Sequence, residues 1–186
     1  MCFPRHWRSS GGVRIPERAK PWNAELPICS LDNRLVIGQS ARVIDKSGTW
    51  WKGENFDDLR EFVVAFTSQN YRADEVRQSV CGACGGTYFG MSLDDDEGCA
   101  QRICRACGVR AFIGDSEEFW DDASPGDAAC PCGAEDFQIA VGFSLIESGE
   151  IRWISVGCRC IACGVLGVYV DWKIDYEPSR QLLDMV

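Results

Sequence analysis

The distribution of cysteines between residues 81 and 163 constrains this chain more than any other feature. They form four short groups: Cys81-Gly-Ala-Cys84, Cys104-Arg-Ala-Cys107, Cys130-Pro-Cys132 and Cys158-Arg-Cys160-Ile-Ala-Cys163. The first two groups are separated by 19 residues, a spacing typical of a metal site. A glycine follows each group directly, at positions 85, 108, 133 and 164. A tight thiol-bearing turn often needs a positive φ at that place, which glycine adopts without steric strain. The pattern therefore predicts four metal-binding turns.

Two zinc ions, each held by four thiolates from two turns, are the expected occupants. The first site comprises Cys81, Cys84, Cys104 and Cys107, and the second comprises Cys130, Cys132, Cys160 and Cys163. The second is less regular, because the Cys130-Pro-Cys132 turn is one residue short and Cys158 is a rival ligand. Strand alternation places Cys158 beside Ile154 and Val156, which indicates a buried apolar thiol rather than a ligand.

The rest of the composition indicates a protein of the cytoplasm. The chain has 12 cysteines in 186 residues, and its start lacks the apolar core of a secretory signal. No stretch is long and apolar enough to cross a bilayer, so we expect no membrane association. In a reducing compartment, cysteines at these spacings are expected to bind metal or to catalyse reactions rather than to form a disulfide framework.

The charge distribution is uneven. Residues 1–52 hold nine Lys/Arg against four Asp/Glu, and the remaining residues hold ten against 24, giving the net charge of −9. Thiolate-bound zinc makes the cysteine-bearing part still more negative. Such a body is poorly suited to attracting a phosphate backbone over long range.

Four segments are expected along the chain. Residues 1–34 form a disordered basic tail, and 35–78 hold a short hairpin and an amphipathic helix. Residues 79–122 and 123–186 form two metal-binding units, the second with a C-terminal segment that we expect to be either a short helix or a capping tail. Asn55 is the expected helix N-cap, and one apolar stripe follows it: Phe56, Leu59, Phe62, Val63 and Phe66. This stripe is expected to pack on the cysteine-bearing sheets, with a protein-docking face as the alternative, and 74–79 is expected to add a helical turn.

The two metal-binding units are interpreted as an internal repeat. Cys104 and Cys160 lie 56 residues apart, as do Cys107 and Cys163, whereas Cys84 and Cys132 lie 48 apart. The difference is expected within the hairpin of each unit, where longer strands preserve the topology. Strands are predicted over 87–93, up to 104, 109–113, 137–145, 152–157 and 165–176. Alternation predicts half-buried sheets, with Leu166, Val168, Val170, Trp172, Ile174 and Tyr176 on one face of the last strand.

The turns Cys81-Gly-Ala-Cys84-Gly and Cys104-Arg-Ala-Cys107-Gly resemble those of the zinc-ribbon, or rubredoxin-like, class. From residue 81 to residue 176 the chain is similar to a tandem pair of ribbons. Its segments 153–157 and 166–176 also resemble small bacterial double-ribbon proteins with no assigned activity. The resemblance implies a small, metal-stabilised, mainly-β fold of two three-stranded antiparallel sheets with one N-terminal amphipathic helix. It also implies four-cysteine sites at the eight positions named above, and ribbons serve many functions.

The expected function is that of a zinc-binding, non-enzymatic protein-interaction or adaptor module. The sole histidine, His6, lies in the expected tail, so neither a histidine-bound catalytic zinc nor a histidine-assisted nucleophile can form in 81–186. Another protein is the expected partner, and the sequence leaves the oligomeric state open. Nucleic-acid binding, through the ribbons or the basic N-terminal arm, is the first alternative; basic residues near the turns and seven tryptophans permit it, and the charge disfavours it. Thiol-redox or iron rubredoxin-like chemistry is the second. Arg102, Arg105 and Arg159 flank the turns and are expected to offset thiolate charge rather than to contact a partner.

Two further features are interpreted as structural. Cys99 is surplus to both sites and is expected to be an unreactive thiol, with a redox role as the alternative. The acidic run 94–97 is interpreted as a solvated hairpin turn rather than a cation site.

Overall fold

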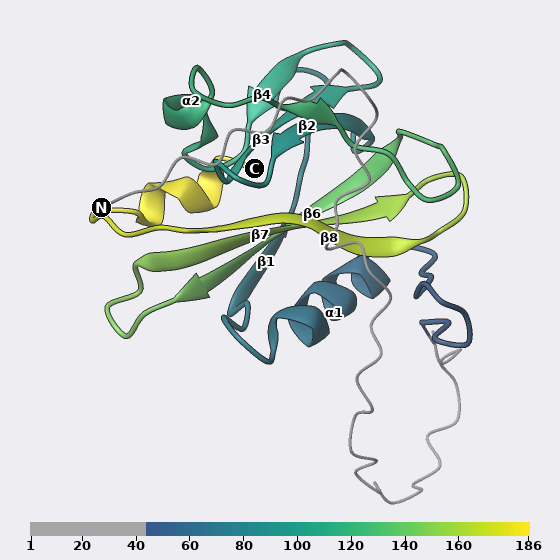
Figure 1. The fold of residues 1–186 in the computed structure, drawn as a ribbon, viewed down its shortest axis with the longest axis horizontal. Helices are drawn as coiled ribbons and strands as arrows, with labels where there is room; N and C mark the ends of the chain where they lie inside the picture. The colour runs from purple at the N-terminus through teal and green to yellow at the C-terminus, as the bar shows by residue number, and fades with distance from the viewer. Residues whose placement is uncertain (1–43) are drawn as a thin grey trace, which may run out of the picture.

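The computed structural model describes residues 44–186, which form a mainly-β domain with a few short helices (Figure 1). The elements are, in chain order, α1 (Phe56–Thr67), β1 (Glu75–Gln78), β2 (Phe89–Asp94), β3 (Cys99–Cys104), β4 (Arg110–Phe112), α2 (Ser116–Phe119), β5 (Gly126–Asp127), β6 (Phe137–Leu145), β7 (Ile151–Cys160), β8 (Leu166–Lys173) and the 3-10 helix η1 (Arg180–Asp184). The tail expected over 1–34, and the first part of the hairpin expected after it, lie outside the described residues.

The strands form a single eight-stranded sheet rather than two separate three-stranded ones, which corrects the prediction from the sequence. The order is β4-β3-β2-β6-β7-β8, with β1 paired to β6 and β5 paired to β2. The two expected hairpin units are present as β2-β3-β4 and β6-β7-β8, called the first and second units below. One antiparallel pair, Phe89 opposite Phe137, joins them. The sheet is therefore continuous across the boundary between the repeats.

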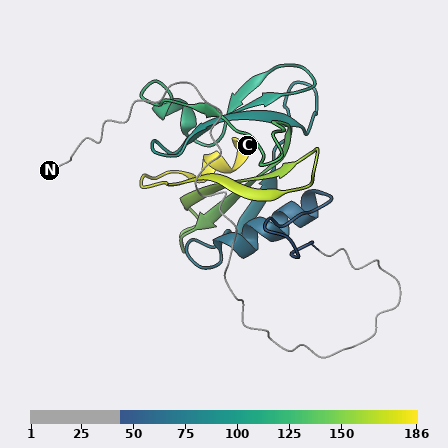
Figure 2. The same ribbon diagram turned by 45° about the vertical axis from the view of Figure 1, so that its right-hand side comes forward.

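This junction relates the two units by an approximate two-fold axis. Phe89 lies opposite Cys104 in the first unit, and Phe137 lies opposite Cys160 in the second, so the two phenylalanines are equivalent. Equivalent backbone bonds flank them: the Arg105 amide donates to the Tyr88 carbonyl, and the Ile161 amide donates to the Asp136 carbonyl, each at 3.0 Å. Because equivalent residues face one another in an antiparallel pair, the axis passes between them. The first unit then turns over one face of the second (Figure 2).

The two repeats differ in length within their hairpins, as the sequence analysis expected. From Phe89 to Cys104 the first hairpin uses the six-residue strands β2 and β3. From Phe137 to Cys160 the second uses a nine-residue and a ten-residue strand. The extra residues lengthen the second hairpin beyond the metal-binding turns, so the turns themselves keep equivalent positions.

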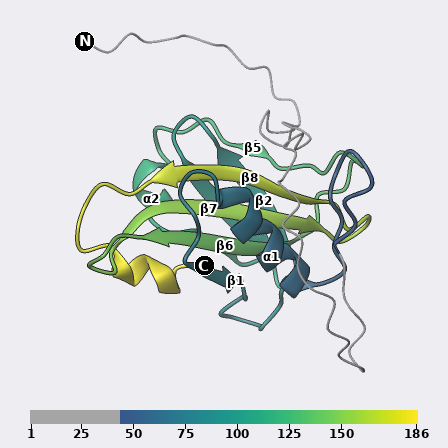
Figure 3. The same ribbon diagram turned by 90° about the horizontal axis from the view of Figure 1, so that it is seen from below.

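The longer second unit is covered on both faces (Figures 1 and 3). On one face, Ile139, Val141, Ile154 and Val170 share a core cluster with Phe89 and other residues of the first unit. On the other face, Ala140, Leu166 and Val168 pack with Leu59, Phe62 and Val63 of α1. The apolar stripe of the helix therefore packs on the cysteine-bearing sheet, as the sequence predicted.

Helix α1 begins at a capping box and packs closely on the sheet. The Asn55 side chain accepts a hydrogen bond from the Asp58 amide, and the Asp58 carboxylate accepts one from the Asn55 amide. Gly142 and Gly157 lie beneath the helix, and a Cβ built on Gly157 would lie 2.3 Å from Val63 Cγ2. Small residues on this face bring the helix close enough to bury β6 on both sides. Alternation alone had predicted a half-buried sheet, which is wrong for this strand.

A β-bulge in β8 overturns the prediction that its alternating apolar residues share one face. The pairing of β7 with β8 shifts where Val156 lies opposite Val170 and Gly157 lies opposite Val168. Tyr169 is the extra residue, and such an insertion reverses the inside-outside alternation. Leu166 and Val168 consequently face α1, whereas Val170 and Trp172 face the first unit.

Two local predictions have different outcomes. The segment expected to add a helical turn over 74–79 contains strand β1, which pairs with β6 from Glu75 opposite Phe143 to Gln78 opposite Ala140. Of the two forms expected for the C-terminal segment, a short helix or a capping tail, the structure has a short helix, η1. The carboxylate of Glu150 accepts hydrogen bonds from the Ser179 amide at 2.6 Å and the Arg180 amide at 3.0 Å, and so holds the start of η1 against the β6–β7 turn.

This contact predicts an acid-sensitive component of stability. The Ser179 backbone amide, assisted by the Ser179 hydroxyl, lowers the pKa of Glu150 from its ordinary value of 4.5. A pKa lower in the folded state stabilises the fold above pH 4.5 and ceases to do so as pH falls through the folded value. We expect Glu150→Gln to lower the melting temperature at pH 7 and to flatten its pH dependence below pH 5. Thermal denaturation monitored by circular dichroism tests this, with Glu147→Gln in the same turn as the control; equal pH profiles for wild type and Glu150→Gln would contradict it.

Candidate metal centres

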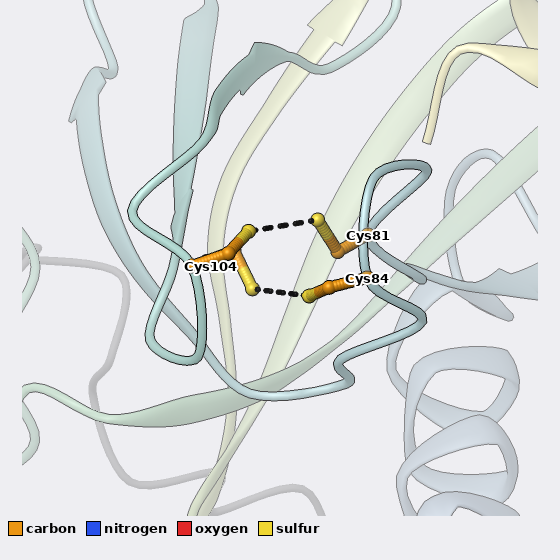
Figure 4. A group of neighbouring side chains, drawn as sticks. Cys81, Cys84 and Cys104 are labelled. Carbon is orange, nitrogen blue, oxygen red and sulfur yellow. Dashed lines mark hydrogen bonds between the residues drawn. The ribbon is translucent and has the colours of Figure 1, made fainter.

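The first site joins the loop between β1 and β2 to the turn between β3 and β4. Cys81 and Cys84 come from the loop, Cys104 is the last residue of β3, and Cys107 lies in the turn after it. Figure 4 shows Cys81 and Cys84 pointing across to Cys104. The Sγ atoms of Cys81 and Cys107 lie 3.6 Å apart, as do those of Cys84 and Cys104. All four thiols therefore converge on one point.

The second site repeats this arrangement in the second unit. Cys130 and Cys132 come from the loop between β5 and β6, Cys160 ends β7, and Cys163 lies in the following turn. The Sγ atoms of Cys130 and Cys163 lie 3.5 Å apart, and those of Cys132 and Cys160 lie 3.7 Å apart. In both sites, all four sulfur atoms lie within 4.8 Å of one another. The shorter Cys130-Pro-Cys132 turn still delivers both of its thiols.

These separations fit a shared ion and not a disulfide. A zinc–sulfur distance of about 2.3 Å in a tetrahedron places neighbouring sulfur atoms about 3.8 Å apart. A disulfide needs sulfur atoms about 2.05 Å apart. The observed separations of 3.5 to 3.7 Å lie close to the first value and far from the second. Each group could therefore hold one metal ion.

The backbone of all four turns is shaped alike. The glycines that follow them have positive φ: 72° at Gly85, 74° at Gly108, 86° at Gly133 and 74° at Gly164. This is the conformation for which the sequence predicted glycine. In the two turns after the hairpins, the glycine amide donates to the carbonyl of the first cysteine at 2.9 Å, from Gly108 to Cys104 and from Gly164 to Cys160.

The turns also direct backbone N–H groups at sulfur, which favours the thiolate form that binds metal. Backbone amides of Ala83 and then Cys84 lower the pKa of Cys81 to about 6. In the second site, the Ala134 amide lowers the pKa of Cys132 to about 7. The pKa of Cys104 is lowered too, whereas the neighbouring thiols Cys84 and Cys130 have raised pKa values, so within each site some thiols favour the thiolate form and others keep their proton.

The surplus cysteines of the described region lie outside both groups. Cys158 is fully buried opposite Ile139, and burial raises the pKa of its thiol well above the usual range. This agrees with its interpretation as an apolar thiol. Cys99 is also buried, and burial raises its pKa to about 11. A buried, protonated thiol is a poor nucleophile, so its surroundings favour the unreactive interpretation over the redox one.

The three arginines near the turns make structural contacts. Arg102 is buried beside the first site, where its guanidinium donates to the carbonyls of Val80 and Val186 and lies 4.9 Å from the centre of the Phe89 ring. Arg105 bridges the two units through the Asp136 carboxylate at 2.6 Å and the Glu135 carbonyl at 3.1 Å. Arg159 donates to the Gln138 side chain. Arg102 and Arg105 are therefore partly engaged within the protein.

The two sites differ in what covers them, which reasoning from the sequence missed. Val165, directly after the last turn of the second site, is 8% exposed. Val109, at the equivalent place in the first site, is 45% exposed. Val80 and Tyr88 beside the first site are 44% and 50% exposed. Aligning the two repeats could have identified Val109 and Val165 as equivalent, but not which of them is covered.

The acidic run 94–97 also has a more structural role than expected. Asp94 is buried, and its carboxylate accepts hydrogen bonds from the Ser124 amide at 2.7 Å and the Asp96 amide at 3.0 Å. This residue therefore ties the β2–β3 turn to the segment before β5, rather than lying in solvent.

Comparisons of the chain with protein families, curated proteins and solved structures found no match. The class of the protein is therefore defined by its geometry alone: a mainly-β domain with two four-cysteine sites that could bind metal, consistent with tandem zinc-ribbon-like motifs. Within residues 44–186, no helix has the length and apolar character needed to span a bilayer.

Proposed function

We propose that this protein binds two zinc ions that stabilise its fold, and that it acts as a non-enzymatic protein-interaction module. The observation that carries the zinc assignment is the pair of four-thiol groups with separations of 3.5 to 3.7 Å. Four thiolates at these separations complete a tetrahedral shell, which leaves no position for a water or a substrate. Zinc sites of this closed kind are structural, because catalysis requires an open position.

The location of the sites supports a stabilising role for the bound metal. Each site ties a loop to the end of a hairpin, and Cys104, Cys130 and Cys160 are all buried in the main core. All four metal-binding turns flank the short junction between Phe89 and Phe137. Cys84 and Cys132 each come five residues before a junction phenylalanine, and the other two turns begin at the cysteines opposite these phenylalanines. A bound ion would fix the loop before each junction phenylalanine to the turn that begins opposite it.

The interaction role is supported by the surface around the first site. Val80, Tyr88 and Val109 are each 44% to 50% exposed, and all three lie within a few residues of its cysteines. Clustered apolar side chains on an otherwise charged surface commonly mark a protein contact. The net charge of −9 favours a protein partner over a nucleic acid.

Native mass spectrometry combined with elemental analysis of the purified chain tests the metal assignment. We expect two zinc ions per chain and a colourless protein, whereas iron in four thiolates would be strongly coloured. Affinity capture with crosslinking, before and after chelation, tests the interaction role. A partner captured reproducibly and lost on chelation would support it. A chain that is metal-free and still folded would contradict the zinc assignment, and capture that is unchanged by chelation would contradict the coupling of interaction to metal.

A further inference from the structure

The edge strands of the two units are equivalent, but among residues 44–186 only one of them has a pairing partner along its outer edge. At the second site, the segment 50–53 lies along the start of β8. The Leu166 amide donates to the Trp51 carbonyl at 2.8 Å, and the Gly53 amide donates to the Gly164 carbonyl at 2.9 Å. Lys52 lies opposite Val165 in an antiparallel bridge. A short extended segment therefore covers the outer edge of the second metal-binding turn.

The corresponding backbone of the first unit has the same geometry. Gly108, Val109 and Arg110 occupy the places of Gly164, Val165 and Leu166, because both trios follow a metal-binding turn. The Cys104 amide donates to the Val109 carbonyl at 2.9 Å, just as the Cys160 amide donates to the Val165 carbonyl at 2.9 Å. Arg110 lies opposite Ile103, as Leu166 lies opposite Arg159.

This register determines which backbone groups point outward from β4. Two hydrogen bonds to β3 show which backbone groups point inward. The Val109 carbonyl accepts from the Cys104 amide, and the Ile113 amide donates to the Ala100 carbonyl at 3.0 Å, so the inward-facing groups belong to every second residue, counted from Val109. The N–H and C=O groups of Arg110 and Phe112 therefore point away from β3. Within residues 44–186, no strand pairs with this edge of β4. An unpaired edge of this kind is a ready template for another strand.

The side chains along this edge indicate what an added strand would carry. In the second unit, Trp50 packs against the main core cluster that includes Val165, and Trp51 lies edge-on to Phe62 with ring centres 5.6 Å apart. Because Lys52 lies opposite Val165, Trp50 stands two residues before the position that faces Val165, on the same face of the segment. In the first unit, Val109, the equivalent of Val165, is exposed, as are Val80 and Tyr88 near the same cysteines in the sequence.

We propose that the outer edge of β4 binds an extended segment of a partner protein, which adds a strand there as residues 50–53 do on β8. The segment carries an aromatic residue in the place of Trp50, two residues before the residue that faces Val109. Backbone hydrogen bonds with Gly108 and Arg110 set its register, and the apolar contact sets its specificity. This inference rests on the proposed interaction role and assigns that role to one edge of the first unit.

The probe is a capped peptide of residues 48–54, Gly-Thr-Trp-Trp-Lys-Gly-Glu, which has the sequence of the natural occupant of the equivalent edge. We expect it to shift the amide resonances of residues 108–112 in the ¹⁵N-labelled, zinc-loaded full chain and to slow hydrogen exchange at Arg110 and Phe112. A peptide with alanine in place of both tryptophans should bind at least about tenfold more weakly, since each buried aromatic contributes more than the 1.4 kcal/mol of a tenfold change.

Matched variants locate the binding surface. Val109→Asp should weaken binding of the peptide about tenfold or more, because it places a charge in the apolar surface next to the aromatic side chain. Ile146→Asp, at an apolar side chain that is 37% exposed in the β6–β7 turn, should leave binding unchanged. Equal effects of the two variants, or shifts elsewhere than 108–112, would overturn the proposal.

Hydrogen exchange also distinguishes two other occupants of the β4 edge from a partner segment. If residues 1–43 of the same chain cover the edge, Arg110 and Phe112 exchange slowly in the free chain at every dilution. If a second copy covers it, their exchange slows with protein concentration and a dimer is seen by sedimentation. Either result overturns the partner-segment proposal. Metal content measured on the same sample separates the strand-addition proposal from the zinc assignment. A chain that holds two zinc ions but does not bind the peptide would contradict strand addition at β4 and leave the zinc assignment intact.

Discussion

Replacing Cys160 by alanine is expected to remove one metal ion and most of the folding free energy. Structural zinc contributes on the order of 10 kcal/mol or more in small domains, whereas whole domains are stable by only about 5–15 kcal/mol. Cys160 is fully buried, ends β7 and lies directly opposite Phe137, so loss of its thiolate frees the turn that packs against the core. We expect native mass spectrometry to report one zinc ion, and urea denaturation to report a much lower midpoint and a broadened transition.

The chain provides a matched control two residues away. Cys158 is equally buried on β7 but lies outside both groups of thiols. Cys158→Ala removes a thiol of the same size from the same strand, so it should cost only about 1 kcal/mol for the small cavity and should leave both zinc ions bound. If the two variants lose equal stability, or if Cys160→Ala retains two ions, the metal does not stabilise the fold as proposed.

The same two cysteines show how far the sequence could specify the site. The spacing of the cysteines and the glycine after each turn predicted which eight thiols lie together, and the structure brings these eight together in two groups. For Cys158, strand alternation alone indicated a place beside Ile154 and Val156, and so a buried apolar thiol rather than a metal ligand. Both inferences depend on local geometry, in which a turn or a strand determines where a side chain points within a few residues.

Errors arose where the fold depends on residues far apart in the chain. Local alternation in β8 could not reveal that Tyr169 is an extra residue, because a bulge is defined by the partner strand. Nor could the pattern of β6 show that α1 covers its Ala140 face, since small residues on a strand are also compatible with exposure to solvent. The fusion of the two units into one sheet rests on a single residue pair, Phe89 opposite Phe137, to which no sequence motif corresponds.

That pair gives the second large prediction: Phe137→Ala should destabilise the protein by about 3–5 kcal/mol. Phe137 is fully buried in the main core, and its ring lies edge-on to Tyr169 with ring centres 5.2 Å apart. Truncation therefore leaves a cavity beside the second site and removes an aromatic contact at the junction. Urea denaturation monitored by circular dichroism should show the lower midpoint, with both zinc ions still bound by mass spectrometry.

Two further variants separate the role of the junction from simple loss of an aromatic ring. Phe119→Ala, at a ring that is 38% exposed in α2, should change stability by no more than about 0.5 kcal/mol. Phe89→Ala should cost about as much as Phe137→Ala, because Phe89 is 1% exposed at the equivalent position. The double variant should lose less than the sum of the two, because both residues stabilise one junction and contacting residues do not act independently. Additive losses would mean that each phenylalanine stabilises only its own unit, and the two units would then be packed together without energetic coupling through this pair.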